Sequence, residues 1–140
     1  MRPPDLAAVV EVERQCYEFP WRSSVFQDCM RAGYVCVVAD CAGTVCGYGI
    51  MSVAAGECHI LNLCVRPDCR RRGLGRSLLQ ALTTIARDRD SRTAFLEVRV
   101  SNRAAQDLYA QDGFNEIATR HQYYRAKSGR EDALVFAKTL

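Results

Sequence analysis

The sequence lacks an apolar segment long enough to cross a membrane, and it lacks the apolar run of a secretory leader. Its longest uncharged stretch, Cys41 to Gly56, is interrupted by Gly, Thr and Ser, whereas a spanning helix needs about 20 mostly apolar residues. At the N-terminus the apolar run before Glu11 is only five residues long, Leu6 to Val10, too short for a leader. No internal repeat and no Ser/Gly/Pro-rich linker divides the 140 residues. We therefore expect one soluble domain, residues 1–140, in the cytoplasm.

A large excess of charge of one sign is also missing. Lys and Arg number 19 and Asp and Glu number 16, a formal net charge of +3, which argues against a basic face of the kind that binds nucleic acid. Positive charge is nevertheless concentrated in one short segment, which contains Arg66, Arg70, Arg71, Arg72 and Arg76. This segment predicts a site for one compact anion, with no direct contact to nucleic acid or membrane.

The eight cysteines do not form a recognisable metal or disulfide pattern. The sequence contains no C-x-x-C pair, and the spacing of Cys36, Cys41 and Cys46 is too open for a zinc knuckle. All eight lie at or before Cys69, so a disulfide framework would leave the second half of the chain without a crosslink. We expect small buried hydrophobic side chains in a reducing cytoplasm, and no metal site.

Hydrophobic periodicity and turn residues predict four helices and six strands. Asp5 is expected to cap the first helix, Ser24 and Gln27 have capping-box spacing for the second, and Gly33 ends that helix. The expected helices span 5–17, 24–33, 73–87 and 102–112, and the expected strands span 34–39, 45–54, 58–65, 93–100, 115–124 and 132–138. The order αα-βββ-α-β-α-ββ predicts the α/β (α+β) class, a mixed sheet with helices on its faces.

The segment from Arg66 to Arg76 joins a predicted strand to a predicted helix. A helix N-terminus has unpaired N–H groups and a partial positive charge, so it binds phosphate well. Gly73 and Gly75 allow the backbone to approach such an anion closely. Neither the nucleotide P-loop pattern nor the dinucleotide fingerprint is present, so a different phosphate-containing ligand is expected.

The pattern Arg-x-x-Gly-x-Gly between a strand and a helix resembles the pyrophosphate-binding signature of the GCN5-related N-acetyltransferases, which bind acetyl-CoA. Residues 61–67, 96–105 and 108–114 resemble further blocks of that family. Residues 19–21, 115–116, 123–124 and 129–133 are similar to the bacterial ribosomal-protein alanine N-acetyltransferases of RimI type. The resemblance runs from about Cys16 to the C-terminus and implies a single-domain, mostly antiparallel mixed sheet flanked by helices.

The sequence departs from the family pattern at two places. The family normally begins with a strand before the first helix, where this chain has only residues 1–4; either the start lies upstream or the first edge strand is missing. Cys64 stands where the family more often has Ala, a change that a core tolerates. Both departures concern local packing rather than chemistry.

The resemblance assigns the coenzyme contacts. Backbone groups of Leu63, Cys64 and Val65 would pair with the pantetheine arm like an added strand. Asn102 would contact the coenzyme beyond its pyrophosphate. The pyrophosphate itself would be held by Arg71, Arg72, Gly73, Leu74, Gly75 and Arg76.

Two residues are candidates for proton transfer. Glu97 is the lone acid in an apolar strand, where desolvation would favour a general base; from the sequence alone a solvent-facing position is equally open, because Arg99 shares its parity. The resemblance favours the base. By spacing alone Tyr109 is a buried helix-face aromatic, and only the resemblance makes it the general acid. His59 ranks behind Glu97 as a base, since a lone histidine is more often a surface or structural residue.

The resemblance also implies the acceptor. A terminal α-amino group titrates near 7.7–8.0 against about 10.4 for lysine, so a modest base suffices for an N-terminal Ala, in family terms that of a small-subunit ribosomal protein. Phe19, Trp21, Tyr123 and Tyr124 would form the peptide pocket, or else simply pack together. The alternatives are another amine (Lys side chain, polyamine, antibiotic or aminoacyl-tRNA) and a non-catalytic RNA- or ribosome-binding module. We expect a monomer or weak dimer.

Overall fold

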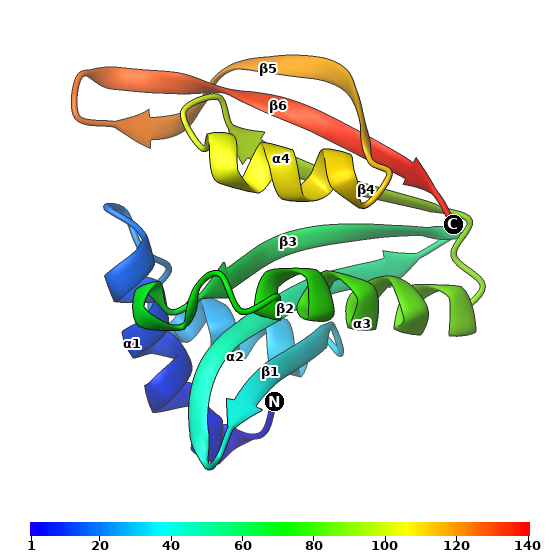
Figure 1. Ribbon diagram of the computed structural model, residues 1–140. Helices are drawn as coiled ribbons and strands as arrows, with labels where there is room; N and C mark the ends of the chain where they lie inside the picture. Colours follow the sequence, from blue (N-terminus) through cyan, green and yellow to red (C-terminus); the bar gives the residue numbers. More distant parts are fainter.

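The computed structural model describes residues 1–140 and has the predicted order of helices and strands (Figure 1). Most element boundaries agree with the prediction within two residues. The last two strands form a longer hairpin than expected, because residues 127–128 make a tight turn. The elements are α1 (Leu6–Cys16), α2 (Ser23–Arg31), β1 (Val35–Cys41), β2 (Thr44–Ala54), β3 (Glu57–Val65), α3 (Leu74–Asp88), β4 (Thr93–Arg99), α4 (Arg103–Gln111), β5 (Asn115–Ala126) and β6 (Gly129–Thr139).

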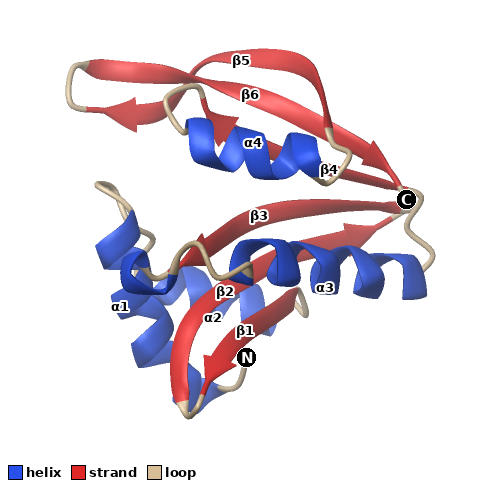
Figure 2. Ribbon diagram, viewed as in Figure 1, coloured by secondary structure: helices blue, strands red, loops and turns tan.

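The six strands form one mixed sheet in the order β1-β2-β3-β4-β6-β5. Every neighbouring pair is antiparallel except β3 with β4, which run parallel. The chain reaches the parallel position through α3, the crossover helix that a parallel pair requires. The predicted mixed, mostly antiparallel sheet is therefore confirmed (Figure 2).

Two hydrophobic cores lie on opposite faces of the sheet. One packs α3 and α4 against the strands and includes Leu79, Leu82 and Leu96. The other packs α1 and α2 against β1, β2 and β3 and includes Val9, Phe26 and Tyr48. The apolar spacing within each helix places one face against the sheet. No helix has the length and apolar content to span a membrane.

Both predicted helix caps are wrong in detail. The Asp5 carboxylate does not cap α1; it accepts a hydrogen bond from the backbone N–H of Arg2 at 2.7 Å, within a short 3₁₀ turn before the helix. Helix α2 begins at Ser23, with Arg22 at the N-cap position and no side-chain cap, so Ser24 and Gln27 already lie inside the helix. Gly33 does follow the end of α2, with a φ of +77°.

One pair among the eight cysteines lies in direct contact. The structure places the sulfur of Cys16 against that of Cys64. Cys16 is the last residue of α1, which packs across β2 and β3, and this packing brings its sulfur to Cys64 from 48 positions away in the sequence. The other six are free, and Cys29, Cys46, Cys58 and Cys69 are buried as expected.

Strands β3 and β4 pair over only part of their length. The parallel register runs from Glu57 opposite Thr93 to Ile60 opposite Leu96 and then stops. The register between β2 and β3 shifts at the same level, with Leu61 as the extra residue. Such a bulge bends its strand. The edge of β3 from Leu61 to Val65 consequently separates from β4 and is not covered by another strand.

Candidate functional site

The N-terminus of α3 has the geometry of an anion-binding turn. Gly73 precedes the helix with a φ of +76°, a left-handed conformation that favours glycine. Gly75 lies in the first turn, where an added Cβ would come 3.2 Å from Leu108 of α4, so its small size permits close packing of the two helices. The first N–H groups of α3 have no helical partner, which leaves donors available for a phosphate.

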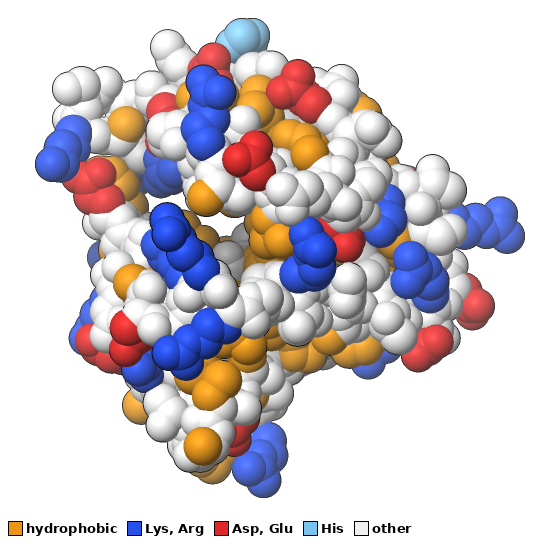
Figure 3. All heavy atoms as spheres, in the orientation of Figure 1, with side chains coloured by type: hydrophobic (Ala, Val, Ile, Leu, Met, Phe, Trp, Pro, Cys, Tyr) orange, Lys and Arg blue, Asp and Glu red, His pale blue; other side chains and the backbone are white.

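Not all of the clustered arginines are available to the same anion. Arg66 makes two hydrogen bonds to the Asp68 carboxylate, at 2.6 and 2.7 Å, and the Nε of Arg70 donates to the Val65 carbonyl at 3.2 Å. Arg71 and Arg72 are exposed, as is Arg76, which bonds Gln111 at 2.8 Å. Figure 3 shows basic side chains beside a hollow between the two halves of the molecule.

The uncovered edge of β3 presents backbone acceptors. The Leu63 carbonyl accepts a hydrogen bond from the Tyr17 hydroxyl at 3.3 Å, and the Val65 carbonyl accepts one from Arg70. Since backbone groups of successive strand residues point to opposite edges, Cys64 instead directs its groups toward β2, where it lies opposite Tyr48. Of the three residues predicted to pair with a pantetheine arm, two face the open edge.

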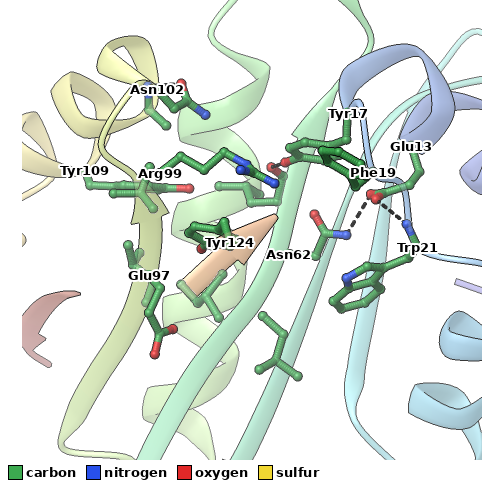
Figure 4. Close-up of a pocket in the computed structure, with 16 residues that line it drawn as sticks. Glu13, Tyr17, Phe19, Trp21, Asn62, Glu97, Arg99, Asn102, Tyr109 and Tyr124 are labelled. Carbon is green, nitrogen blue, oxygen red and sulfur yellow. Dashed lines mark hydrogen bonds between the residues drawn. The ribbon is translucent and has the colours of Figure 1, made fainter. Parts of the chain in front are cut away.

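A cavity of about 170 Å³ lies where β3 and β4 diverge. Figure 4 shows Tyr109, Asn102 and Arg99 on one side and Tyr17, Phe19 and Glu13 on the other, with Asn62 and Tyr124 between them. Of the predicted site residues, the cavity is lined by Phe19, Trp21, Leu63, Glu97, Asn102, Tyr109 and Tyr124. Four polar residues that the prediction did not include also line it: Glu13, Tyr17, Asn62 and Arg99.

Glu97 lies at the border of two cavities. It lines the cavity just described and a second, more open one on the same side of β4. Its side chain is only 10% exposed, and its carboxylate contacts His59 Nε2 and lies 3.4 Å from a guanidinium nitrogen of Arg120. The solvent-facing alternative considered for Glu97 is therefore a poor description of its position.

The hydroxyl of Tyr109 points into the cavity from α4 (Figure 4). The residue is 7% exposed, and its ring packs against Phe114 and Phe136. Burial, with smaller contributions from Tyr17 and Tyr124, raises the pKa of Tyr109 well above its usual range. The phenol is protonated at neutral pH, as it already is at the ordinary tyrosine pKa near 10, and its burial makes it a weaker acid. Asn102 caps the same helix, because its side chain accepts from the backbone N–H of Ala105 at 3.2 Å.

A buried carboxylate organises the opposite wall. Glu13 of α1 is 1% exposed and accepts hydrogen bonds from the Tyr48 hydroxyl, the Asn62 side-chain amide at 2.8 Å and the backbone N–H of Trp21 at 2.9 Å. These bonds fix the loop after α1 and direct the Asn62 oxygen toward the cavity (Figure 4). The sequence pattern of α1 does not distinguish Glu13 from the exposed Glu11. The one signal that could have identified Glu13 is that it falls on the helix face with the buried residues Val9 and Val12.

The β5–β6 hairpin covers one side of the cavity. The Arg125 guanidinium lies 5.0 Å from the ring centre of Phe19, and Arg99 lies 4.5 Å from that of Tyr124. Arg99 also bonds Glu131 at 2.8 Å. Tyr123, predicted to share the peptide pocket, does not line the cavity; it is 42% exposed and packs edge-on against Tyr124. The structure contains no group of three or more His, Cys, Asp or Glu placed to hold a metal ion.

Comparisons with known proteins agree with this architecture. Residues 6–114 match the family model described as the acetyltransferase (GNAT) family. The chain is 38% identical over 133 residues to the [ribosomal protein bS18]-alanine N-acetyltransferase of Escherichia coli K12, covering 95% of this chain and 90% of that protein. The crystal structure of the Escherichia coli ribosomal-protein-S18-alanine N-acetyltransferase superposes with a TM-score of 0.92 at 36% identity, over 99% of this chain and 90% of that one. Ard1 from Thermoplasma volcanium superposes with a TM-score of 0.91 at 25% identity, over 100% and 94%.

Proposed function

Because the chain belongs to the acetyltransferase (GNAT) family, we propose that it transfers an acetyl group from acetyl-CoA to the α-amino group of a protein that begins with Ala. The proposed acceptor is a small-subunit ribosomal protein, by analogy with the relatives named for ribosomal protein bS18. The proposed setting is the cytoplasm, and the proposed working form is a monomer or weak dimer.

The residues around the open edge of β3 fit acetyl-CoA. The unpaired N–H groups at the start of α3, together with exposed Arg71 and Arg72, suit a pyrophosphate. The uncovered backbone of Leu63 and Val65 suits an extended arm with amide groups. When bound, acetyl-CoA supplies an acetyl group activated as a thioester. We assign Leu74, Gly75 and Arg76 to the same phosphate-binding turn. We assign Asn102 to a contact with the coenzyme beyond its pyrophosphate.

Glu97 and Tyr109 have complementary tasks in this proposal. Glu97 accepts the proton that an acceptor ammonium must lose before its nitrogen is nucleophilic, directly or through one water molecule. Tyr109 holds a phenolic proton inside the cavity and donates it to the departing sulfur. An α-amino group needs only a modest base, because it titrates near 7.7–8.0 rather than near 10.4 as lysine does.

The observation that carries the proposal is the divergence of β3 and β4. It places an uncovered strand edge, the N-terminus of α3 and a cavity lined by Glu97 and Tyr109 beside one another. The loop after α1 and the β5–β6 hairpin flank that cavity through Phe19 and Tyr124. A peptide end entering between them would reach Glu97, and this arrangement favours a chain terminus over a broad protein surface.

The test is CoA release from acetyl-CoA with three acceptors: a short peptide that begins with Ala, the same peptide with its N-terminus blocked, and free small amines. We expect turnover with the first alone. Equal turnover with the blocked peptide would show that the enzyme acetylates a side-chain amine instead. Turnover only with small amines would show that the acceptor is a small molecule and not a protein. Steeply salt-dependent RNA binding without any CoA release would instead support the binding-module alternative.

A further inference from the structure

His59 is the nearest neighbour of Glu97 that no part of the proposed function uses. It belongs to β3 and lies opposite Phe95 in the short parallel register with β4. Its Nε2 contacts the Glu97 carboxylate at Oε2. The imidazole faces the second cavity, which Ser52, Phe95, Ile117 and Arg120 also line. The contact therefore joins β3 to the first residue of β4 beyond the last paired level, Ile60 opposite Leu96.

We infer that His59 is a positioning residue that holds the Glu97 carboxylate at the border of the two cavities. A glutamate side chain has three rotatable bonds, and a general base works only when its oxygen lies within hydrogen-bonding reach of the proton. By binding Oε2, His59 leaves Oε1, whose other contact is Arg120 at 3.4 Å, as the oxygen for the proton of the acceptor. This inference rests on the proposed role of Glu97 as the base.

No other contact of Glu97 fixes it as closely. Arg120 approaches Oε1 at 3.4 Å from β5, and its side chain is 55% exposed, so its position is weakly restrained. Other ionisable side chains around Glu97 include Glu57 and Cys58 in the second cavity and Arg99 in the first. Tyr124 is a further one, and its pKa is raised by burial and by the Glu97 charge. From β2 and β6 the cavity receives only Ser52, Ala54 and Val135.

A purely structural role for His59 is a poor alternative. Its side chain is 37% exposed, so its removal leaves no buried void. The backbone pairing of β3 with β4 does not depend on the side chain. The position therefore allows substitution without loss of the fold, and the effect on catalysis can be measured separately.

The experiment compares four variants in the CoA-release assay with the Ala-starting peptide: His59→Gln, His59→Ala, Glu97→Gln and the double variant His59→Gln/Glu97→Gln. His121→Gln is the matched control, because His121 is exposed on β5 and away from the cavity. Thermal unfolding and CoA titration calorimetry accompany each variant. We expect His59→Gln to lower kcat by about 10-fold, with the KM for the peptide and the Kd for CoA nearly unchanged.

Two further results are expected from the same set. Imidazole added to His59→Ala restores part of kcat, which a packing role would not allow. The double variant is no slower than Glu97→Gln, because His59 acts through Glu97. A double variant slower than Glu97→Gln would overturn the inference, and so would a wild-type kcat in His59→Gln beside a strongly reduced one in Glu97→Gln, although the proposed function would stand. A wild-type kcat in Glu97→Gln would reject the base assignment itself, and with it the role of His59.

Discussion

Glu13 offers the sharpest test of how the cavity wall is built. Replacing it by Leu keeps the buried position filled but removes the acceptor for three donors: the Tyr48 hydroxyl, the Asn62 amide and the Trp21 backbone N–H. A buried donor left without a partner costs about 1–3 kcal/mol; the Tyr48 bond is buried, and the Asn62 and Trp21 bonds are partly buried, which favours the lower end of that range for them. Even at the lower end, the three together lower the free energy of unfolding by about 3 kcal/mol.

This free energy converts to a measurable shift in melting temperature. At roughly 2.1 cal/mol/K per residue, the 140 residues have an unfolding entropy of about 0.3 kcal/mol/K. A loss of about 3 kcal/mol then lowers Tm by about 10 °C. Glu13→Gln should fall between wild type and Glu13→Leu, because its amide oxygen can still accept from the Tyr48 hydroxyl and the Asn62 amide, whereas its NH2 group is a donor and cannot accept from the Trp21 N–H.

The assay is thermal unfolding followed by circular dichroism, with Glu11→Leu as the control. Glu11 lies on the same helix but is exposed, and it has only a 3.4 Å contact with Gln15, so its replacement should leave Tm nearly unchanged. If Glu13→Leu has the same Tm as the Glu11→Leu control, the hydrogen bonds to Glu13 do not stabilise the fold and the reasoning is refuted.

Three other predictions follow from the structure. Tyr109→Phe should lower kcat far more than it weakens CoA binding, and an unchanged kcat would remove its hydroxyl from the reaction. Burial raises the pKa of Tyr17 to about 12, so the stability that its neutral phenol contributes is complete below pH 10 and is lost as the pH rises from 10 toward 12; Tyr17→Phe should make the decline in unfolding free energy over that range less steep in denaturant titrations, and an unchanged decline would contradict this. Gly73 and Gly33 both have a positive φ and no atom within 4 Å of an added Cβ, so Gly73→Ala and Gly33→Ala should each lower the free energy of unfolding by about 1 kcal/mol. Only Gly73→Ala should weaken CoA binding measured by calorimetry. Equal CoA affinities of the two variants would show that the Gly73 turn does not bind the coenzyme.

Local signals in the sequence were sufficient for the order of the elements. The leucine spacing in residues 74–88 marks a helix with one buried face, and the short β-branched runs mark strands. Gly73 and Gly75 marked the turn between β3 and α3 because their small size has a local reason, a left-handed φ and a close helix contact. These features depend on residues near one another in the chain, which is why they were predictable.

The wall of the cavity depends on contacts between distant residues. Glu13 meets Asn62 and Tyr48 across 49 and 35 positions, and no periodicity within α1 indicates that meeting. The Cys16–Cys64 pair was missed for the same reason. The Asp5 and Ser24 caps were wrong because side chains of that type also bond backbone outside the helix start, and Asp5 bonds Arg2. Composition likewise assigned Arg66 to the anion, although Asp68 engages it.

The extra residue at Leu61 has a consequence for the solubility of the chain. An open strand edge is a place where a second molecule can add a strand, and soluble proteins usually block such edges. Here the blocking groups are side chains: the Tyr17 phenol on one carbonyl and the Arg70 guanidinium on the next. Both are polar side-chain contacts that a ligand can displace, and the Val65 carbonyl also lies 3.4 Å from the Cys16 sulfur. The same two residues thus block strand addition by a second molecule while leaving the edge accessible to the extended ligand proposed above.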